Sequence, residues 1–458
     1  DGFDITLTDL NKLRNAPYGN YIIQVTGKVG VFCDDDIQLD INSDWDITVE
    51  YESDITIIEE IGGYFVEDQS INSAKIKPAP FVIIPSIGET LDFTYSHPEN
   101  SRVTIRVFDL SGRIVTSLID KYIDEALYNK KSGYYMKFNP FGKKGDYITS
   151  PNISVLFSEI ITIWIVLFWK KLKSPTKFNL VELGAGNGEM IFQILKTFEK
   201  FPLIKESCRI NILEKSIYLK KIQKQKLKNR NIKWLKNLNE VSNIPSIFIG
   251  NEFFDALPIK QFVKKDNEWY ERNVKFSKLN QPKFIDILND IKKIEKKIGF
   301  KISHKQKFIE YSPLSIEYLK IIARKINSNS GGILIIDYGY WSNNMKNTLK
   351  SISNHKFNEV LDNFGQSDIT YNLSFKLVEK ILKKFNLKIG GMTNQKNFLT
   401  NLGILKRAEI ISKNLPFSKK ADIYLRVKRL IDKNSMGELF KVILATKKNV
   451  HFQTGFVN

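Results

Sequence analysis

The chain has 458 residues, of which 42% are hydrophobic and 12% aromatic, so it belongs with folded proteins of two or three domains, not with disordered chains. Its two cysteines lie far apart and its four histidines form no Cys/His cluster, which argues against a disulfide framework and a metal site. The net charge is +19, but residues 1–116 carry 20 acidic and 8 basic side chains, a balance of −12 before a strongly basic remainder.

Residues 1–117 have the pattern of an all-β module. Stretches of alternating β-branched and polar residues are separated by Gly, Pro, Asn and Asp turns. The stretch SRVTIRVFDLSGRIVTSLID at 101–120 resembles the closing hairpin of Ig-like tail modules in hook-capping and secreted proteins. The resemblance implies an extracytoplasmic Ig-like sandwich, and a β-sandwich without a catalytic role fits equally well. The charge step leads us to hypothesise that the joint near 117–120 is an artificial or recent fusion.

From residue 118 onward the pattern changes to that of an α/β domain, which we expect to run to 458. FNLVEL (178–183), RINILE (209–214), SIFIGN (246–251) and GGILIIDYG (331–339) are typical of buried parallel strands, with amphipathic helical stretches between them. This rhythm predicts a doubly wound, Rossmann-like sheet with added helical segments. The apolar stretch that begins at Ile160 is shorter than the ~20 residues of a membrane span, so we expect a core helix and no transmembrane segment.

The strand FNLVEL leads directly into a glycine-rich loop. In LVELGAGNGEM (180–190), glycines at every second position let the backbone turn sharply and approach a ligand. A dinucleotide site would need G-x-G-x-x-G, and the preceding acid would repel pyrophosphate. S-adenosylmethionine has no phosphate and carries a sulfonium and an ammonium, so the loop favours this cofactor and resembles that of class I methyltransferases. The candidate cofactor residues are Glu182, Gly184, Ala185, Gly186 and Gly188.

A second acid, Glu214, ends the next predicted strand. A carboxylate at this place can accept hydrogen bonds from both ribose hydroxyls of a nucleoside cofactor. The alternatives are a glycine turn with only a structural role and a strand-end acid that is merely exposed.

Several further stretches resemble MidA-type methyltransferases, in matching order over residues 118–448. They are GYYM (133–136), PFGKKGDYITSPNIS (140–154), IGNEFFDALPIKQFV (249–263), ILIIDYGY (333–340), NQKNFLTNLGI (394–404) and MGELFKVILA (436–445). The family includes a mitochondrial arginine methyltransferase that assists assembly of respiratory complex I. The resemblance implies methylation of a protein arginine to symmetric dimethylarginine on a complex I subunit. It also implies a cytoplasmic protein in a bacterium, or one of the mitochondrial matrix in a eukaryote.

An arginine acceptor is cationic, so carboxylates must hold its guanidinium group. We predict Glu252 as the clamp, with Asp255 as helper and Asn251 beside them, because these residues follow the strand SIFIG. The alternative is that Glu252 only caps or salt-bridges a neighbouring helix. In the family pattern the loop 142–154 lies over the cofactor, so the lid candidates are Asp146, Tyr147, Thr149 and Ser150. Ser150 and Pro151 could instead only begin a helix.

The chain departs from the family pattern at four positions, and two other functions stay open. The departures are Asn152, Ser158, Asn372 and Ser374, and the last two fall among the expected substrate contacts near 368–375. Two strand-end acids, Glu310 and Asp337, could face the cleft. The Lys-rich run 214–236 would suit a methyltransferase of RNA or DNA, but it has few interleaved aromatic residues, so we expect no nucleic-acid partner. A non-catalytic assembly platform is the other alternative. The sequence sets neither the acceptor nor the oligomeric state.

Overall fold

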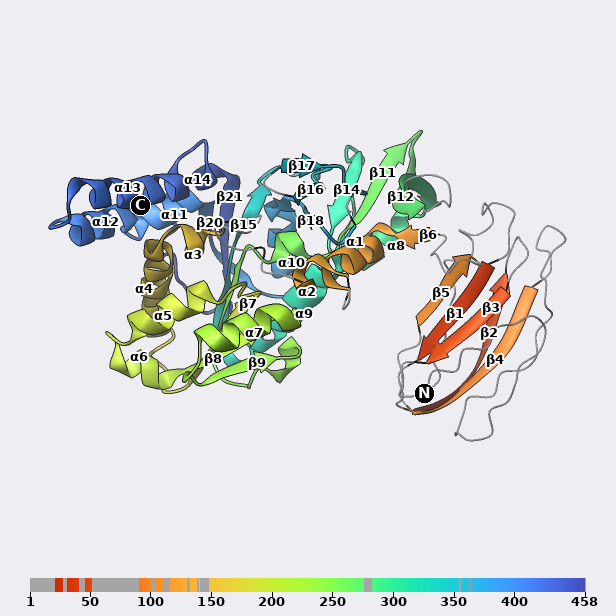
Figure 1. The fold of residues 1–458 in the computed structure, drawn as a ribbon, viewed down its shortest axis with the longest axis horizontal. Coiled ribbons are helices and arrows are strands. Elements are labelled where there is room, and N and C mark those ends of the chain that lie inside the picture. Colours follow the sequence, from red (N-terminus) through yellow and green to blue (C-terminus); the bar gives the residue numbers. More distant parts are fainter. Residues whose placement is uncertain are drawn as a thin grey trace. The chain divides into compact units, whose positions relative to one another are not determined.

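The chain divides into two compact units. The computed structural model describes residues 119–129, 132–137, 140, 148–275, 282–353, 356–362 and 364–457, and the backbone of six strands before residue 119. One unit comprises residues 1–118 and 273–287, and the other comprises 119–272 and 288–458 (Figure 1). The sequence predicted a boundary between residues 117 and 118 and no contribution of 273–287 to the first module.

Strands β1 to β5 of the first unit lie in two sheets. In one, β1 (Tyr21–Gly27) pairs in parallel with β3 (Asp46–Tyr51) and antiparallel with β5 (Thr104–Asp109). In the other, β2 (Val31–Asp40) pairs antiparallel with β4 (Thr90–Glu99). These strands agree with the all-β pattern of the sequence. The side chains of this unit lie outside the described residues, so the Ig-like sandwich stays a prediction.

The second unit is built on a doubly wound sheet, as the sequence predicted. Its strands lie in the order β9 (Ile232–Leu235), β8 (Cys208–Leu213), β7 (Phe178–Leu183), β10 (Ser246–Asn251), β15 (Gly331–Tyr340), β21 (Phe440–Thr446) and β20 (Lys388–Asn394). The first five are mutually parallel, and β21 is antiparallel to both of its neighbours. The chain winds outward from β7 to β9 and returns to β10 on the other side of β7. The strand order therefore reverses between β7 and β10, the place where such sheets bind ligands.

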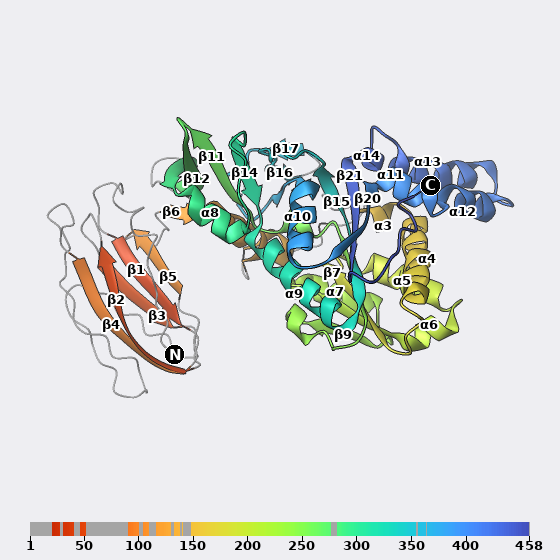
Figure 2. The same ribbon diagram turned by 180° about the vertical axis from the view of Figure 1, so that it is seen from behind.

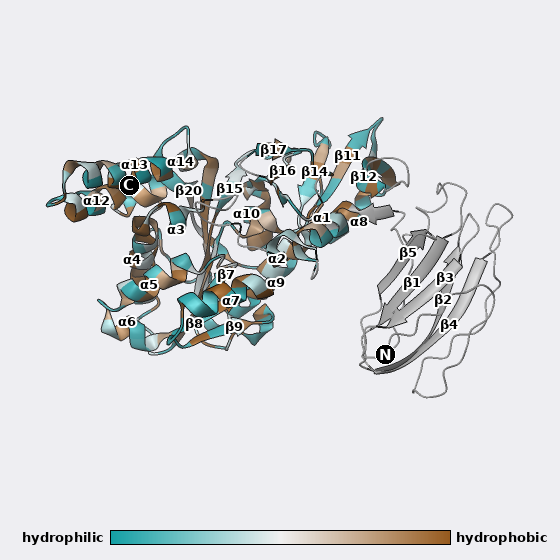
Figure 3. Cartoon of the chain, in the orientation of Figure 1, coloured by the Kyte–Doolittle hydropathy of each residue, from teal (hydrophilic) through white to brown (hydrophobic). Residues whose placement is uncertain are grey.

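Helices cover both faces of this sheet because its central strands are buried on both sides, and Figure 3 shows hydrophobic residues along β21. One face packs on α4 (Val155–Lys171), α5 (Glu189–Phe198), α6 (Pro202–Ser207), α11 (Gln395–Asn401), α12 (Ile404–Ser412), α13 (Phe417–Ile431) and α14 (Met436–Leu439). The view from behind in Figure 2 shows α9 (Pro313–Asn329) and α10 (Phe375–Lys384) over the other face. Helix α4 carries the apolar stretch from Ile160, so the expected core helix is confirmed. Among the described residues, no helix combines the length and the apolar content that crossing a bilayer requires.

Shorter elements stand before and between the main strands. The helices are α1 (Ile119–Tyr128), α2 (Tyr134–Lys137), α3 (Ser150–Ile153), α7 (Ile217–Lys226), α8 (Ile291–Ile298) and the 3-10 turns η3 (Leu238–Glu240) and η4 (Phe254–Ala256). The strands are β6 (Thr116–Leu118), β11 (Lys260–Lys265), β12 (Glu268–Lys275), β13 (Lys283–Asn289), β14 (Phe308–Tyr311), β16 (Lys350–Ser353), β17 (Lys356–Asn358), β18 (Asp368–Thr370) and β19 (Leu373–Ser374). Strand β11 pairs antiparallel with β12 and β14, and η4 follows β10 at the switch point.

Candidate functional site

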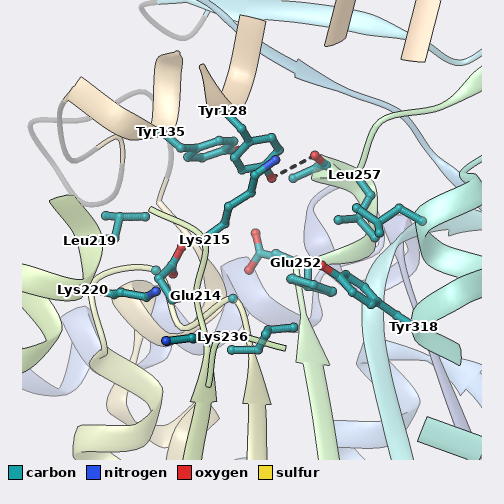
Figure 4. Close-up of a pocket in the computed structure, with 16 residues that line it drawn as sticks. Tyr128, Tyr135, Glu214, Lys215, Leu219, Lys220, Lys236, Glu252, Leu257 and Tyr318 are labelled. Carbon is teal, nitrogen blue, oxygen red and sulfur yellow. Dashed lines mark hydrogen bonds between the residues drawn. The ribbon is translucent and has the colours of Figure 1, made fainter. Parts of the chain in front are cut away.

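A cavity of about 410 Å³ opens beyond the carboxyl ends of β7, β8 and β10 (Figure 4). Its lining residues are Tyr128, Tyr135, Gly184, Gly186, Leu213, Glu214, Lys215, Leu219, Lys220, Lys236, Glu252, Phe253, Ala256, Leu257, Leu314 and Tyr318. A smaller cavity of about 30 Å³ shares Gly184, Gly186 and Glu252 with it and reaches Glu182, Ala185, Asn251 and Thr149. Part of the predicted cofactor loop and two of the predicted acceptor residues, Asn251 and Glu252, thus line adjoining cavities at the switch point, whereas Gly188 and Asp255 line neither.

The glycine loop after β7 needs its glycines for two reasons. Gly184, Gly186 and Gly188 have φ angles of +64°, +52° and +77°, a region that side chains rarely adopt. A Cβ on Gly184 would also lie 2.6 Å from Cδ2 of Phe253, too close for real carbon atoms. The loop therefore approaches the turn after β10 with bare backbone.

Glu182 is a buried carboxylate, and one of its oxygens has no hydrogen-bond partner within the described part of the chain. It is 4% exposed, and among the described residues no hydrogen bond reaches its Oε2. Burial, with a smaller contribution from the charge of Glu214, raises the pKa of Glu182 to about 8. An isolated ionised carboxylate is costly in such surroundings unless a cation neutralises it. The ammonium group of an amino-acid ligand fits this requirement.

Glu214 follows β8 and lies in the wall of the larger cavity. Its Oε1 accepts a hydrogen bond from the backbone N–H of Ser216 at 2.9 Å, and its Oε2 accepts one from Nε2 of Gln223 at 3.0 Å. Burial raises the pKa of Glu214 to about 7, although these hydrogen bonds act in the opposite direction. The carboxylate is therefore held in place at the cavity wall, where a ribose could use it as an acceptor.

Glu252 stands where the two cavities meet, and its backbone is strained. Its φ angle is +52°, uncommon for a residue with a side chain, and such outliers cluster at functional sites. Its Oε1 accepts hydrogen bonds from the backbone N–H of Ser150 at 3.0 Å and from Nδ2 of Asn251 at 3.1 Å. Burial raises the pKa of Glu252 to about 8. The carboxylate thus contacts the first residue of α3, as the capping alternative requires, and also faces both cavities, as the clamp requires.

Asp255 lies behind Glu252 and lines neither cavity. Its Oδ2 accepts a hydrogen bond from Oγ1 of Thr370 at 3.0 Å, and burial raises its pKa to about 6. Asp337, at the end of β15, accepts hydrogen bonds from the backbone N–H groups of Phe253, Phe254 and Asp255 at 3.3, 2.9 and 3.3 Å. Both aspartates therefore support the turn that carries Glu252. Of the predicted acceptor residues, the structure brings only Glu252 and Asn251 to the cavities.

The predicted lid is described only in part. Asp146 and Tyr147 lie outside the described residues. Thr149 lines the smaller cavity, and Ser150 begins α3. Asn152, one of the departures from the family pattern, accepts a hydrogen bond at its Oδ1 from Nδ2 of Asn187 in the glycine loop, at 2.9 Å. Helix α3 is therefore tied to the loop through an amide pair.

Two of the other departures, Asn372 and Ser374, and the remaining predicted strand-end acid, Glu310, have hydrogen-bond partners, whereas no partner reaches the Ser158 hydroxyl among the described residues. Asn372 accepts a hydrogen bond from Nζ of Lys350 at 3.3 Å, and Ser374 caps α10. Ser158 is buried within α4, and Glu310 accepts a hydrogen bond from Nε2 of Gln261 at 2.6 Å. None of these four lines either cavity.

Aromatic walls were not predicted as part of the site. Tyr128 stacks on Tyr135 with ring centroids 5.5 Å apart, and Phe253 stacks on Tyr318 at 5.9 Å. Nζ of Lys215 lies 4.4 Å from the centroid of the Tyr128 ring (Figure 4). These residues come from separate segments without a common spacing, and only the family stretch GYYM (133–136) pointed toward one of them. Within the described part of the chain, no group of three His, Cys, Asp or Glu residues could hold a metal ion.

Comparisons with known proteins agree with this arrangement. A sequence-family model described as S-adenosyl-L-methionine-dependent methyltransferase matches residues 160–393. The mitochondrial protein arginine methyltransferase NDUFAF7 of Xenopus laevis is 28% identical over 348 residues, 70% of this chain and 79% of that protein. Its Drosophila melanogaster homolog is 29% identical, over 71% of this chain and 80% of that protein. A solved Burkholderia thailandensis structure with bound S-adenosyl-homocysteine has a TM-score of 0.63 at 21% identity and covers 74% of this chain and 90% of that chain, which shows a shared fold.

Proposed function

Because the chain belongs to the family of S-adenosyl-L-methionine-dependent methyltransferases, we propose that it methylates an arginine side chain of a protein substrate. The observation that carries the proposal is the half-buried Glu252 carboxylate, which lies on a strained backbone where the two cavities meet. The relatives from Xenopus laevis and Drosophila melanogaster are named protein arginine methyltransferases and mitochondrial, which supports an arginine acceptor and a mitochondrial site of action. The resemblance to MidA-type methyltransferases supports a complex I subunit as acceptor and symmetric dimethylarginine as product.

The residues present fit the cofactor. S-adenosyl-L-methionine supplies a methyl group bound to a sulfonium. A nitrogen can attack the methyl carbon, and S-adenosyl-homocysteine is the leaving group. Glu182, whose Oε2 lacks a partner in the described structure, would neutralise the cofactor's ammonium. The bare backbone from Gly184 to Gly188 gives room for close approach, and Glu214 would accept hydrogen bonds from the ribose. We assign Thr149 to the same site because it lines the smaller cavity.

Glu252 can perform two tasks for an arginine acceptor. A guanidinium group stays charged at physiological pH, and a carboxylate matches its planar fork of N–H donors. Binding would place opposite charges next to each other, so the pKa of Glu252 would fall and the carboxylate would ionise. During the reaction the attacking nitrogen must lose a proton. The Glu252 carboxylate, once ionised beside the guanidinium group, is placed to take that proton.

Glu252→Gln tests this assignment because glutamine keeps the size and the acceptor oxygen but has no charge. We expect transfer of tritiated methyl groups to complex I subunits to fall by a factor of about 100 or more. We expect cofactor affinity, measured by calorimetry, to change by no more than about threefold, since Glu182 and Glu214 are assigned to hold the cofactor. Glu409→Gln is the control, because its carboxylate is 63% exposed on α12 and should leave both quantities unchanged.

The same assay separates the other functions. Label that enters RNA or DNA instead of protein would replace the arginine proposal with a nucleic-acid methyltransferase. A wild-type protein that binds no cofactor would indicate a non-catalytic assembly platform. Full turnover by Glu252→Gln would remove Glu252 from the catalytic role.

We also propose that residues 1–117 are a separate module, fused to the methyltransferase domain. Two observations support this proposal. One compact unit of the chain has a boundary at Leu118, and the charge balance changes sign near residue 116. Because β6 pairs with the end of β12, a fragment that carries the methyltransferase domain should begin before Thr116. An uninterrupted natural reading frame across 117–120 in source DNA would contradict an artificial joint.

A further inference from the structure

We propose that Gln223 is a positioning residue for the cofactor site, because one buried amide joins the carboxylate of Glu214 to the glycine loop. The inference rests on the proposed roles of these two groups in holding the cofactor. Gln223 lies on α7 and is 0% exposed. It lines neither cavity, so it acts only through the groups that it touches.

Both N–H donors of the Gln223 amide are used, and its oxygen accepts one hydrogen bond. Its Nε2 donates to the backbone oxygen of Gly186 at 2.8 Å and to Oε2 of Glu214 at 3.0 Å. Its Oε1 accepts a hydrogen bond from Nε1 of Trp234 on β9 at 2.9 Å. An indole N–H can only donate, so Trp234 fixes which end of the amide is oxygen and turns both N–H groups toward the site. The orientation of Gln223 is therefore set from outside the site.

This arrangement fixes the relative position of two chain segments that come from different strands. The Glu214 carboxylate is held between Nε2 of Gln223 and the backbone N–H of Ser216. The loop packs on the same side chain, because a Cβ on Gly188 would lie 3.5 Å from Cγ of Gln223. Preorganised acceptors and donors lower the cost of ordering a site when the ligand binds. Through its two hydrogen bonds, Gln223 holds both the glycine loop and the Glu214 carboxylate in place before the ligand binds.

The same hydrogen bond also favours the ionised form of Glu214. The charged or titratable groups around this carboxylate are Glu182 on β7, Tyr128 on α1, Lys220 on α7, and Lys215 and Lys236 in the cavity wall. Burial raises the pKa of Glu214, whereas the bonds from Ser216 and Gln223 lower it. Loss of the Gln223 donor should therefore raise this pKa further, and only the ionised carboxylate accepts from two hydroxyls without donating.

Gln223→Met tests the inference because methionine has a similar size and helix propensity but no N–H groups. We expect calorimetric affinity for S-adenosyl-homocysteine at pH 7 to fall about 10- to 100-fold. We also expect the midpoint of its pH dependence between pH 6 and 9 to move to higher pH. Gln225→Met is the matched control, because it makes the same change at an exposed position of the same helix that lines neither cavity. Its pH midpoint should match that of the wild type.

A purely structural role would lower the melting temperature and the affinity without moving the pH midpoint, and that result would overturn the inference. Wild-type affinity in Gln223→Met would overturn it as well. Should the methionine variant not fold, Gln223→Glu keeps the size and the acceptor for Trp234, and its second acid should move the midpoint further upward; an unmoved midpoint would again contradict the role. If the wild type binds S-adenosyl-homocysteine but transfers no methyl group to protein, the proposed function is wrong. The positioning role of Gln223 would not be affected by that result.

Discussion

At the residue scale, the site depends on three carboxylates that the fold keeps away from water. Glu182, Glu214 and Glu252 follow or belong to three neighbouring strands, and burial raises their pKa values to about 8, 7 and 8. A site of this kind holds few charges until a cationic cofactor and a cationic acceptor enter it. Binding then supplies the charge that stabilises the ionised carboxylates, so ligand charge and site charge are complementary.

The bare loop gives the first prediction at this scale. Gly186→Val introduces a β-branched residue at φ +52°, which strains the backbone and fills the space beside the cavity. We expect calorimetric binding of S-adenosyl-homocysteine to disappear. Gly403→Val is the control, because Gly403 has φ +86° with nothing within 4 Å of a Cβ and precedes α12, away from both cavities. It should lower the melting temperature while binding persists, and equal loss of binding in both variants would show that strain alone is responsible.

Sequence reasoning found residues that a local motif defines and missed those that tertiary packing defines. Glu182, the glycines and Glu214 follow from the spacing of strand ends, and the structure places all of them except Gly188 in the cavity walls. Asp255 was expected beside Glu252, but η4 turns it toward Thr370. Gln223 lies within a Lys-rich helix, where only the packing of α7 against β9 and the loop reveals its partners.

At the element scale, the end of β15 organises the turn after β10. Asp337 is 0% exposed, and its Oδ2 accepts hydrogen bonds from the three backbone N–H groups of residues 253–255. Burial raises its pKa well above the ordinary range, and the nearby charges of Asp255 and Glu252 act in the same direction. The turn that presents Glu252 is therefore held from the neighbouring strand and not by its own short helix.

Replacement of Asp337 should loosen this turn. Asp337→Ala leaves three buried N–H groups without an acceptor, at about 1–3 kcal/mol for each group that finds no other partner. We expect a large fall in melting temperature, faster hydrogen exchange at 253–255 and loss of methyl transfer. Asp290→Ala is the comparison, since Asp290 caps α8 at an exposed position and should cost only about 1 kcal/mol. Equal losses in the two variants would contradict a special role for Asp337.

The elements themselves were largely predictable because buried strands and core helices leave strong apolar patterns. β7, β8, β10 and β15 appear where FNLVEL, RINILE, SIFIGN and GGILIIDYG predicted them, and α4 lies where the apolar stretch begins at Ile160. The strand order and the antiparallel β21 were not predicted, since strand pairing across more than a hundred residues has no local signature. The grouping of 273–287 with the first unit had no sequence signal either.

At the scale of the whole molecule, the buried acids make stability depend on pH. Glu182, Glu214 and Glu252 have pKa values raised from 4.5 to about 8, 7 and 8 in the folded protein. Between pH 4.5 and about pH 7 to 8, these three carboxyl groups keep their protons in the folded protein but have released them in the unfolded chain. The stability that these groups contribute is therefore complete below about pH 4.5 and is lost as the pH rises through 7 to 8.

Thermal unfolding of the free protein checks this linkage. We expect the melting temperature to fall between pH 6 and pH 8.5, and to fall less steeply in Glu182→Gln, which removes one of the titrating groups. Glu240→Gln, which changes an acid with no assigned role at η3, should keep the wild-type slope. A Glu182→Gln profile parallel to that of the wild type would show that Glu182 does not titrate in this range.

The left-handed backbone at Glu252 has a consequence for anyone who engineers this protein. A search for heat resistance alone would favour glycine at position 252, because glycine relaxes a φ angle of +52° and removes a buried acid at the same time. The variant would unfold at a higher temperature, but it would lack the carboxylate that we assign to bind the substrate. Thermal stability and catalysis thus place opposite demands on residue 252. Efforts to stabilise the protein should leave this residue unchanged.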